Sequence, residues 1–265
     1  FRFNYHVIMK ATATALASLF AGAAAFAPAP KFQTTTALSE SVSDLEALAK
    51  SANPIVKFYD PLQLSKRDFW EQGNEATIGF LRHAEIKHGR VAMAAFVGYC
   101  VQSNFHWPAP MCLDGTPFPS IDLGPESQWD AIPASAKWQI ILYIGFLEIW
   151  DEIGGDDLPH YTKGRKPGKY PSFKKFSEYV HPVSDLYDPA GYNRNMSEET
   201  KERRLVAEIN NGRLAQLGIF GFLCADTIPG SVPSLKDIAI PYSGETMAPF
   251  EKGMMFDFSN LHASL

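Results

Sequence analysis

Two short motifs in this chain place an acid, a possible metal ligand and a base at the same spacing. They are Glu85-x-x-His88-x-Arg90 and Glu208-x-x-Asn211-x-Arg213. Carboxylate, imidazole and amide side chains can each offer an oxygen or nitrogen lone pair to a metal ion. Residues three apart lie on neighbouring parts of one helical face. The spacing therefore predicts two helices that each present an acid and a ligand side by side.

The two motifs belong to a longer internal repeat. Residues 85–92 realign with residues 208–215, 123 positions later, and Gly98 then matches Gly221. Such a duplication predicts two similar helices that run in the same direction and pack about a two-fold axis.

Two-fold packing would also pair the charges. An unpaired charge inside a membrane span costs about 2.5 to 3.5 kcal/mol on insertion scales. Glu85 is expected to meet Arg213, and Glu208 to meet Arg90, so that each carboxylate is neutralised and keeps lone pairs for a further ligand. The alternative is that these pairs only lock the helices together.

Three segments are expected to be membrane-spanning helices. They cover about residues 76–105, 135–153 and 201–226. None contains the roughly 18 to 20 apolar residues that a lone span needs. Lysine and arginine are dense in residues 50–90 and 151–213, whereas residues 91–136 contain none. Under the positive-inside rule, this alternation indicates three crossings. The connections 107–133 and 154–195 are expected to be irregular, apart from one short helix near residues 171–179.

A metal that needs a single axial ligand fits the motifs. The magnesium of a chlorophyll is such a metal, because the ring nitrogens supply its other ligands. His88 and Asn211 could each supply that donor, and the small residues after both motifs would let flat rings approach the backbone. Packing roles for His88 and for the small residues are the alternatives. Glu148, late in the second helix, is either another ligand or an interfacial surface residue.

Composition argues against other classes of protein. The net charge of −5 argues against a nucleic-acid partner. The three cysteines are too few and too scattered for a disulfide framework or a zinc cluster. A metalloenzyme would need three protein ligands around one open site, which the motifs do not supply.

Residues 1–43 are predicted to be a leader, and residues 44–265 the three-helix domain. An uncharged, alanine-rich run ends near Phe26-Ala27-Pro28 and is followed by a stretch rich in threonine and serine. This pattern resembles the two-part plastid leaders of algae with secondary plastids. A plain secretory signal is the alternative.

Taken together, the two motifs resemble the chlorophyll-binding helices of the light-harvesting complex superfamily, over about residues 53–250. Tyr59-Asp60-Pro61-Leu62, the Gly-x-x-Glu of the second helix and the tail from Val232 to Phe250 resemble its fucoxanthin–chlorophyll a/c branch. The resemblance implies an all-α membrane protein with three transmembrane helices, the first and third crossed about a pseudo-two-fold axis. It implies an antenna that passes excitation energy to a photosystem and is not an enzyme; a photoprotective, energy-dissipating member is the alternative.

The resemblance also implies a set of pigments and sites. The cofactors would be chlorophyll a, chlorophyll c and fucoxanthin or a related xanthophyll. The implied magnesium ligands, with the arginines that support them, are Glu85, His88, Glu148, Glu208, Asn211, Arg90 and Arg213. Asp60 and Asp188 would lie near the carotenoid head groups. Many members carry glutamine or histidine where this chain has Ala225, so Gln102 and Gln216 are possible additional ligands or simply interfacial polar residues.

The implied location is the plastid thylakoid membrane, with the amino terminus in the stroma and the carboxyl terminus in the lumen. The implied partners are a photosystem I or II core, neighbouring antenna subunits and thylakoid lipids, with no nucleic acid.

Overall fold

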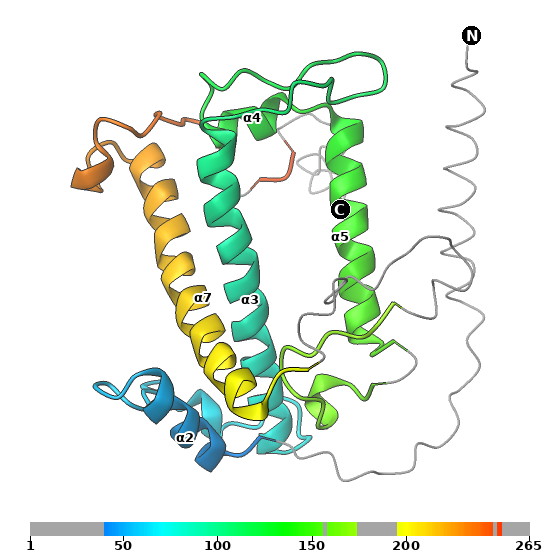
Figure 1. Cartoon of the computed structure of the whole chain (residues 1–265), viewed down its shortest axis with the longest axis vertical. Helices are drawn as coiled ribbons and strands as arrows, with labels where there is room; N and C mark the ends of the chain where they lie inside the picture. Colours follow the sequence, from blue (N-terminus) through cyan, green and yellow to red (C-terminus); the bar gives the residue numbers. More distant parts are fainter. Residues whose placement is uncertain (1–39, 156–157, 174–194, 246–247, 251–265) are drawn as a thin grey trace, which may run out of the picture. The chain divides into compact units, whose positions relative to one another are not determined.

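A computed structural model describes residues 40–155, 158–173, 195–245 and 248–250 of the chain (Figure 1). Its α-helices are α2 (Val42–Ala52), α3 (Asn74–Gln102), α4 (Pro125–Ala131), α5 (Ala134–Glu152) and α7 (Glu198–Thr227). Single 3₁₀ turns occur at η1 (Leu64–Lys66), η2 (Tyr161–Lys163) and η3 (Pro233–Leu235). No strand occurs in these ranges. Nearly all of the predicted leader, residues 1–43, lies outside the described residues, as does Asp188.

Local signals explain where these helices begin and end. Ser41 forms a capping box at the start of α2, and the hydroxyl of Ser197 accepts a hydrogen bond from the first turn of α7. Pro125 occupies the first turn of α4, where its missing N–H costs nothing. After α5, Gly154 has a φ of +75°, and an added Cβ there would collide with the carbonyl oxygen of Leu158. A glycine is therefore required where the chain turns away from α5.

The three long helices expected from the sequence are confirmed as helices α3, α5 and α7, with ends shifted by three residues or fewer. The prediction that residues 107–133 are irregular is wrong in its last part, because α4 forms there. The short helix expected near residues 171–179 lies mostly outside the described residues. Among the helices that the structure describes, none is long and apolar enough to cross a membrane.

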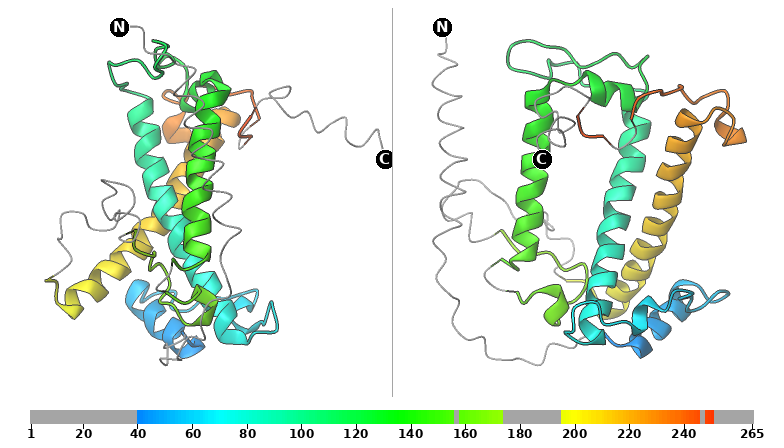
Figure 2. Two further views of the ribbon diagram at one scale, coloured as in Figure 1. Left: turned by 90° about the vertical axis from the view of Figure 1, so that its right-hand side faces the viewer. Right: turned by 180° about the vertical axis from the view of Figure 1, so that it is seen from behind.

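Helices α3 and α7 cross each other (Figure 2). Two glycines, Gly89 and Gly212, meet at the crossing. A Cβ added to Gly212 would lie 2.8 Å from the Cα of Gly89, and one added to Gly89 would lie 3.1 Å from the Cα of Gly212. Ile86 and Ile209, each three residues before the glycine of its helix, are both buried. The two glycines occupy equivalent positions of the repeat, as a pseudo-two-fold arrangement predicts. The backbones can approach this closely only because neither helix carries a side chain at the crossing.

Helix α5 is joined to α3 near one end only of each helix, as far as the described side chains show. His83 Nε2 lies 2.8 Å from Asp151 Oδ2, and Lys87 Nζ lies 2.5 Å from Glu148 Oε2. Later residues of α3 meet earlier residues of α5, so these two helices are antiparallel. By the same reasoning α3 and α7 are parallel, because Glu85 meets Arg213 and Tyr99 meets Asp226 further along both helices.

The glycine crossing can be tested with two alanine substitutions in α7. Gly212→Ala is expected to lower the free energy of unfolding by about 1 to 3 kcal/mol, because the new methyl group would meet backbone that cannot move aside. Gly221→Ala is the matched control, since no described atom lies within 4 Å of its added Cβ. It should be neutral or stabilising, because alanine favours helix. Thermal melts that shift equally for both variants would contradict the crossing.

Candidate functional site

The acids and arginines of the two repeated motifs form ion pairs with one another across the crossing. Arg213 donates from Nε and Nη2 to Glu85 Oε1, at 2.8 and 2.6 Å. Arg90 donates from Nε to Glu208 Oε1 at 2.5 Å. The predicted pairing of each acid with the arginine of the other helix is therefore confirmed. Both carboxylates are only partly exposed, so each arginine neutralises a charge that water cannot fully solvate.

The two halves of the repeat are not identical around these acids. Arg82 also donates to Glu85, through Oε2, and it contacts Glu40 as well. Leu205 occupies the equivalent position in the other half. The sequence analysis missed Arg82 because it compared only the positions at which the two halves agree.

One ring nitrogen of His88 is held by the backbone of its own helix. Its Nδ1 lies 2.7 Å from the carbonyl oxygen of Ala84. A carbonyl oxygen can only accept, so Nδ1 carries a hydrogen, and Nε2 is the ring nitrogen left to offer a lone pair. Histidines that bind metals commonly use this arrangement, in which one ring nitrogen is held by the backbone and the other faces the metal. His88 and Asn211 are both exposed on the outer sides of their helices.

A buried polar cluster joins α3, α5 and the segment 158–173, and the sequence analysis did not predict it. The backbone N–H of Gly168 donates to His83 Nδ1 at 3.2 Å, so His83 donates from Nε2 to Asp151. Arg165 Nη2 binds the other carboxylate oxygen of Asp151 at 2.9 Å, and both side chains are fully buried. Lys87 completes the cluster, 2.8 Å from Asp151. The one sequence signal was Asp151 itself, an acid one helical turn after Glu148.

The remaining predicted site residues do not converge on the motifs. Asp60 accepts hydrogen bonds from Leu64 N and from the backbone and hydroxyl of Ser65, so it shapes the turn at η1. The hydrogen bond from the Ser65 hydroxyl lowers the pKa of Asp60. Gln102 lies exposed at the last position of α3, and Gln216 lies half-buried on α7. No described side-chain contact links either glutamine to the motifs.

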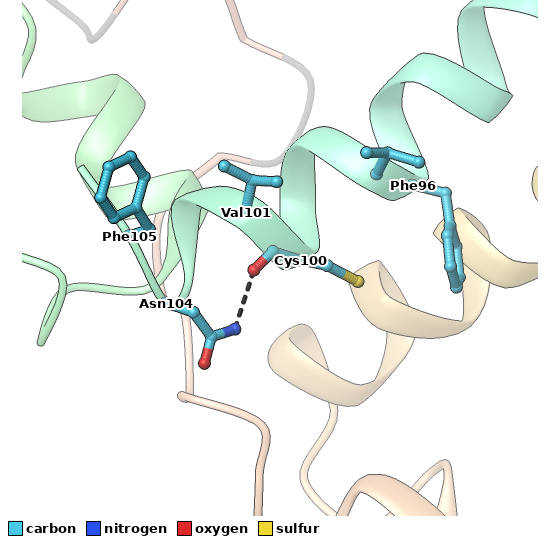
Figure 3. A pocket seen from close by; sticks show the side chains of 6 residues that line it. Phe96, Cys100, Val101, Asn104 and Phe105 are labelled. Carbon is cyan, nitrogen blue, oxygen red and sulfur yellow. Dashed lines mark hydrogen bonds between the residues drawn. The ribbon is translucent and has the colours of Figure 1, made fainter. Parts of the chain in front are cut away.

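Beyond the charged motif, α3 carries an apolar groove (Figure 3). The groove has a volume of about 470 Å³ and is lined by Phe96, Val97, Cys100, Val101, Asn104 and Phe105. Asn104 turns its amide N–H back onto the carbonyl oxygen of Cys100, at 2.8 Å. With no charged lining residue, this surface suits an apolar body rather than an ion.

The donors fit metals that already carry most of their ligands. Among the residues that the structure describes, no three His, Cys, Asp or Glu side chains gather as a metal cage would require. Each candidate instead stands on the flank of a helix as a lone donor, as His88 does with its bare Nε2. A metal held in the plane of a ring needs just such a donor on one side. The residues present therefore fit a chlorophyll magnesium.

An acidic cluster lies near the carboxyl end of α3. Asp226, buried at the end of α7, accepts a hydrogen bond from the hydroxyl of Tyr99. Tyr242 donates to Asp130 Oδ2 at 2.8 Å. The carboxyl oxygens of Glu126 are buried beside these acids. Burial, with the adjacent carboxyls of Asp226 and Asp130, raises the pKa of Glu126 to about 7.

Comparison with known proteins gives the class of protein that this fold and these donors define. The sequence model of the family described as Chlorophyll A-B binding protein matches residues 44–227. The chain belongs to this family, which is a family of pigment-binding light-harvesting proteins and not of enzymes.

The similar proteins identify the branch. The chain is 34% identical over 214 residues to fucoxanthin-chlorophyll a-c binding protein B, chloroplastic, of Phaeodactylum tricornutum, covering 79% of this chain and 92% of that protein. It is 34% identical to protein F of the same organism over 208 residues, covering 78% and 91%. It is 32% identical over 231 residues to the fucoxanthin-chlorophyll a-c binding protein of Trieres chinensis, covering 84% and 98%. The resemblance read from the motifs is therefore confirmed.

The raised pKa of Glu126 predicts a pH dependence of stability. Its folded pKa of about 7 exceeds the ordinary value of 4.5, so the folded state holds a proton that the unfolded chain has lost. This contribution is complete below about pH 4.5 and is lost as the pH rises through about 7. Glu126→Gln should remove it and stabilise the protein at pH 8 by about 1 kcal/mol, discounted because the residue is partly exposed.

Thermal melts of the purified protein at pH 5, 6.5 and 8 measure this effect. Glu46→Gln, on the exposed side of α2, is the control and should melt like the wild type at every pH. If the wild type and Glu126→Gln respond to pH in parallel, Glu126 does not titrate in this range.

Proposed function

We propose that this chain is a light-harvesting antenna that binds chlorophyll a, chlorophyll c and fucoxanthin or a related xanthophyll. The observation that carries the proposal is the crossing of α3 and α7, where two exchanged ion pairs flank a glycine contact. Just beside these pairs, His88 keeps an outward lone pair. A scaffold of this kind fixes donors at set positions on rigid helices. When bound, the pigments absorb light and pass excitation to one another and to a photosystem.

Five residues are proposed as magnesium ligands: Glu85, His88, Glu148, Glu208 and Asn211. The two arginines of the exchanged pairs support the ligands Glu85 and Glu208, because they cancel the charge of each carboxylate without using all of its lone pairs. Gln102 and Gln216 are kept as possible further ligands. Asp60 and Asp188, of which the second lies outside the described residues, are proposed to lie near the head groups of two carotenoids.

We also propose that α3, α5 and α7 span the thylakoid membrane. The distribution of side chains supports this, because charged groups such as Arg82, Asp151 and Arg165 are buried while large apolar residues lie exposed. The most exposed apolar side chains on α3 and α7 are those of Val91, Val97, Leu214, Leu217 and Phe220. Exposed apolar side chains in this number suit contact with pigments and lipid rather than with water.

The proposed topology places the amino terminus in the stroma and the carboxyl terminus in the lumen, after removal of a plastid leader at residues 1–43. Basic residues in 50–90 and 151–213 support this orientation. The proposed partners are a photosystem I or II core, neighbouring antenna subunits and thylakoid lipids. The alternative, a dissipating member of the same fold, is favoured by the buried Glu126 and Asp226. Fluorescence lifetimes of the pigmented protein at neutral and acid pH separate the two.

Substitutions of His88 test whether it is an axial ligand. His88→Asn is expected to retain the full chlorophyll count, because asparagine already stands at the equivalent position 211. His88→Leu should lose one chlorophyll per chain, because leucine offers no lone pair. Pigments extracted after refolding with a fixed mixture give the count. If His88 had only a packing role, the leucine variant would be tolerated and the asparagine variant would not. A leucine variant that keeps all its chlorophyll would show that His88 is not a ligand.

The exchanged ion pairs predict loss of pigment on the helix that was not mutated. Arg90→Leu should cost the chlorophyll on Glu208, because the carboxylate would be left unbalanced in apolar surroundings. Arg213→Leu should cause a smaller loss of the chlorophyll on Glu85, since Arg82 still binds that carboxylate. Arg203→Leu, on an exposed part of α7, is the control and should keep every pigment. Cryo-EM maps in which Arg90→Leu loses pigment only from α3 would refute the exchange.

A further inference from the structure

Lys87 connects the motif of α3 to α5. Its ammonium lies 2.5 Å from Glu148 Oε2 and 2.8 Å from Asp151 Oδ2. The lysine side chain is mostly buried, whereas the side chain of Glu148 is 55% exposed. Lys87 therefore approaches Glu148 from the protein interior and holds one carboxylate oxygen, while the outer part of the carboxylate stays accessible.

Comparison of the two halves of the repeat links the basic residue at position 87 to the presence of α5. His83 and Lys87 are four residues apart, and both contact α5. Their equivalents in the other half are Val206 and Asn210, which carry no charge. Asn210 instead donates to the carbonyl oxygen of Ala52, at the end of α2. The basic residue occurs only in the half that has an acidic neighbour on α5.

Every carboxylate among the proposed ligands has a cation supplied by another helix. Arg213 serves Glu85, and Arg90 serves Glu208. A neutral ligand such as His88 needs no such partner. The reason is electrostatic: a chlorophyll centre is itself neutral, so a carboxylate that binds it keeps its negative charge in apolar surroundings.

We propose that Lys87 is the positioning residue of a chlorophyll site on Glu148, with the same role that the two arginines have for the central acids. This inference rests on the proposed function. Lys87 cancels the charge of Glu148, fixes Oε2, and leaves Oε1 as the axial donor. It touches the ligand and not the metal.

The test separates charge balance from a purely structural role. Variants are refolded with a fixed mixture of chlorophyll a, chlorophyll c and fucoxanthin, and pigments per chain and absorption spectra are measured. Lys87→Met should lose one chlorophyll, and its difference spectrum should match that of Glu148→Leu. Lys87→Arg should keep it. Lys87→Met combined with Glu148→Gln should regain it, because a neutral amide donor needs no cation.

Lys201→Met is the matched control, since it removes an exposed lysine–glutamate pair of 2.7 Å on α7 and should lose no pigment. Full pigment in Lys87→Met overturns the inference, as does full pigment in Glu148→Leu. A loss of several pigments that Glu148→Gln does not reverse also overturns it, because Lys87 would then act only through Asp151. A wild-type chain that takes up no chlorophyll refutes the proposed function itself. This outcome differs from failure of the inference about Lys87, in which the wild-type chain still binds chlorophyll.

Discussion

The rest of the structure depends on the contact between Gly89 and Gly212. At this separation an arginine on one helix reaches a carboxylate on the other and binds it at 2.5 to 2.8 Å. Because the contact joins equivalent positions of a repeat, the two ion pairs arise together, one on either side of it. The pairs in turn let acids lie on the helix flanks without an exposed negative charge. A bulkier residue at the crossing would therefore act on the acids as well as on the packing.

The charges between α3, α5 and α7 balance locally near the crossing, even where they are far from water. In the cluster at α5, Lys87 and Arg165 face Glu148 and Asp151, and His83 is held as the neutral tautomer by Gly168. Buried ions in such sets keep their hydrogen bonds, which offsets part of the cost of removing them from water. Apolar side chains can then occupy the outer surface. Buried charges beside exposed apolar side chains are unusual in a water-soluble protein, in which charged groups rarely lie fully buried.

The sequence predicted the features that the duplication repeats and missed several that it does not. Helices α3 and α7, their parallel direction and the exchanged pairs follow from matching residues 85–92 to 208–215, whereas α5 was predicted from its apolar segment and the alternation of charge along the chain. Arg82 and His83 stand where the halves differ, so comparison of the halves gave no reason to select them. Helix α4 was missed because proline and glycine dominate its surroundings, although Pro125 is well suited to a first turn. The pigment ligands themselves stay predictions, since lone donors show no mutual geometry to confirm.

The departures from symmetry follow from the number of helices. Two equivalent helices and one connector cannot have equivalent neighbours, so α3 meets α5 where α7 meets the end of α2. The face of α3 defined by residues 83 and 87 carries basic side chains for this reason, whereas the matching positions of α7, Val206 and Asn210, carry no charge. A duplicated motif thus receives different charges on its two outer sides. Two chemically similar donors on these sides would hold similar pigments in different electrostatic fields, which is a physical means of giving them different excitation energies.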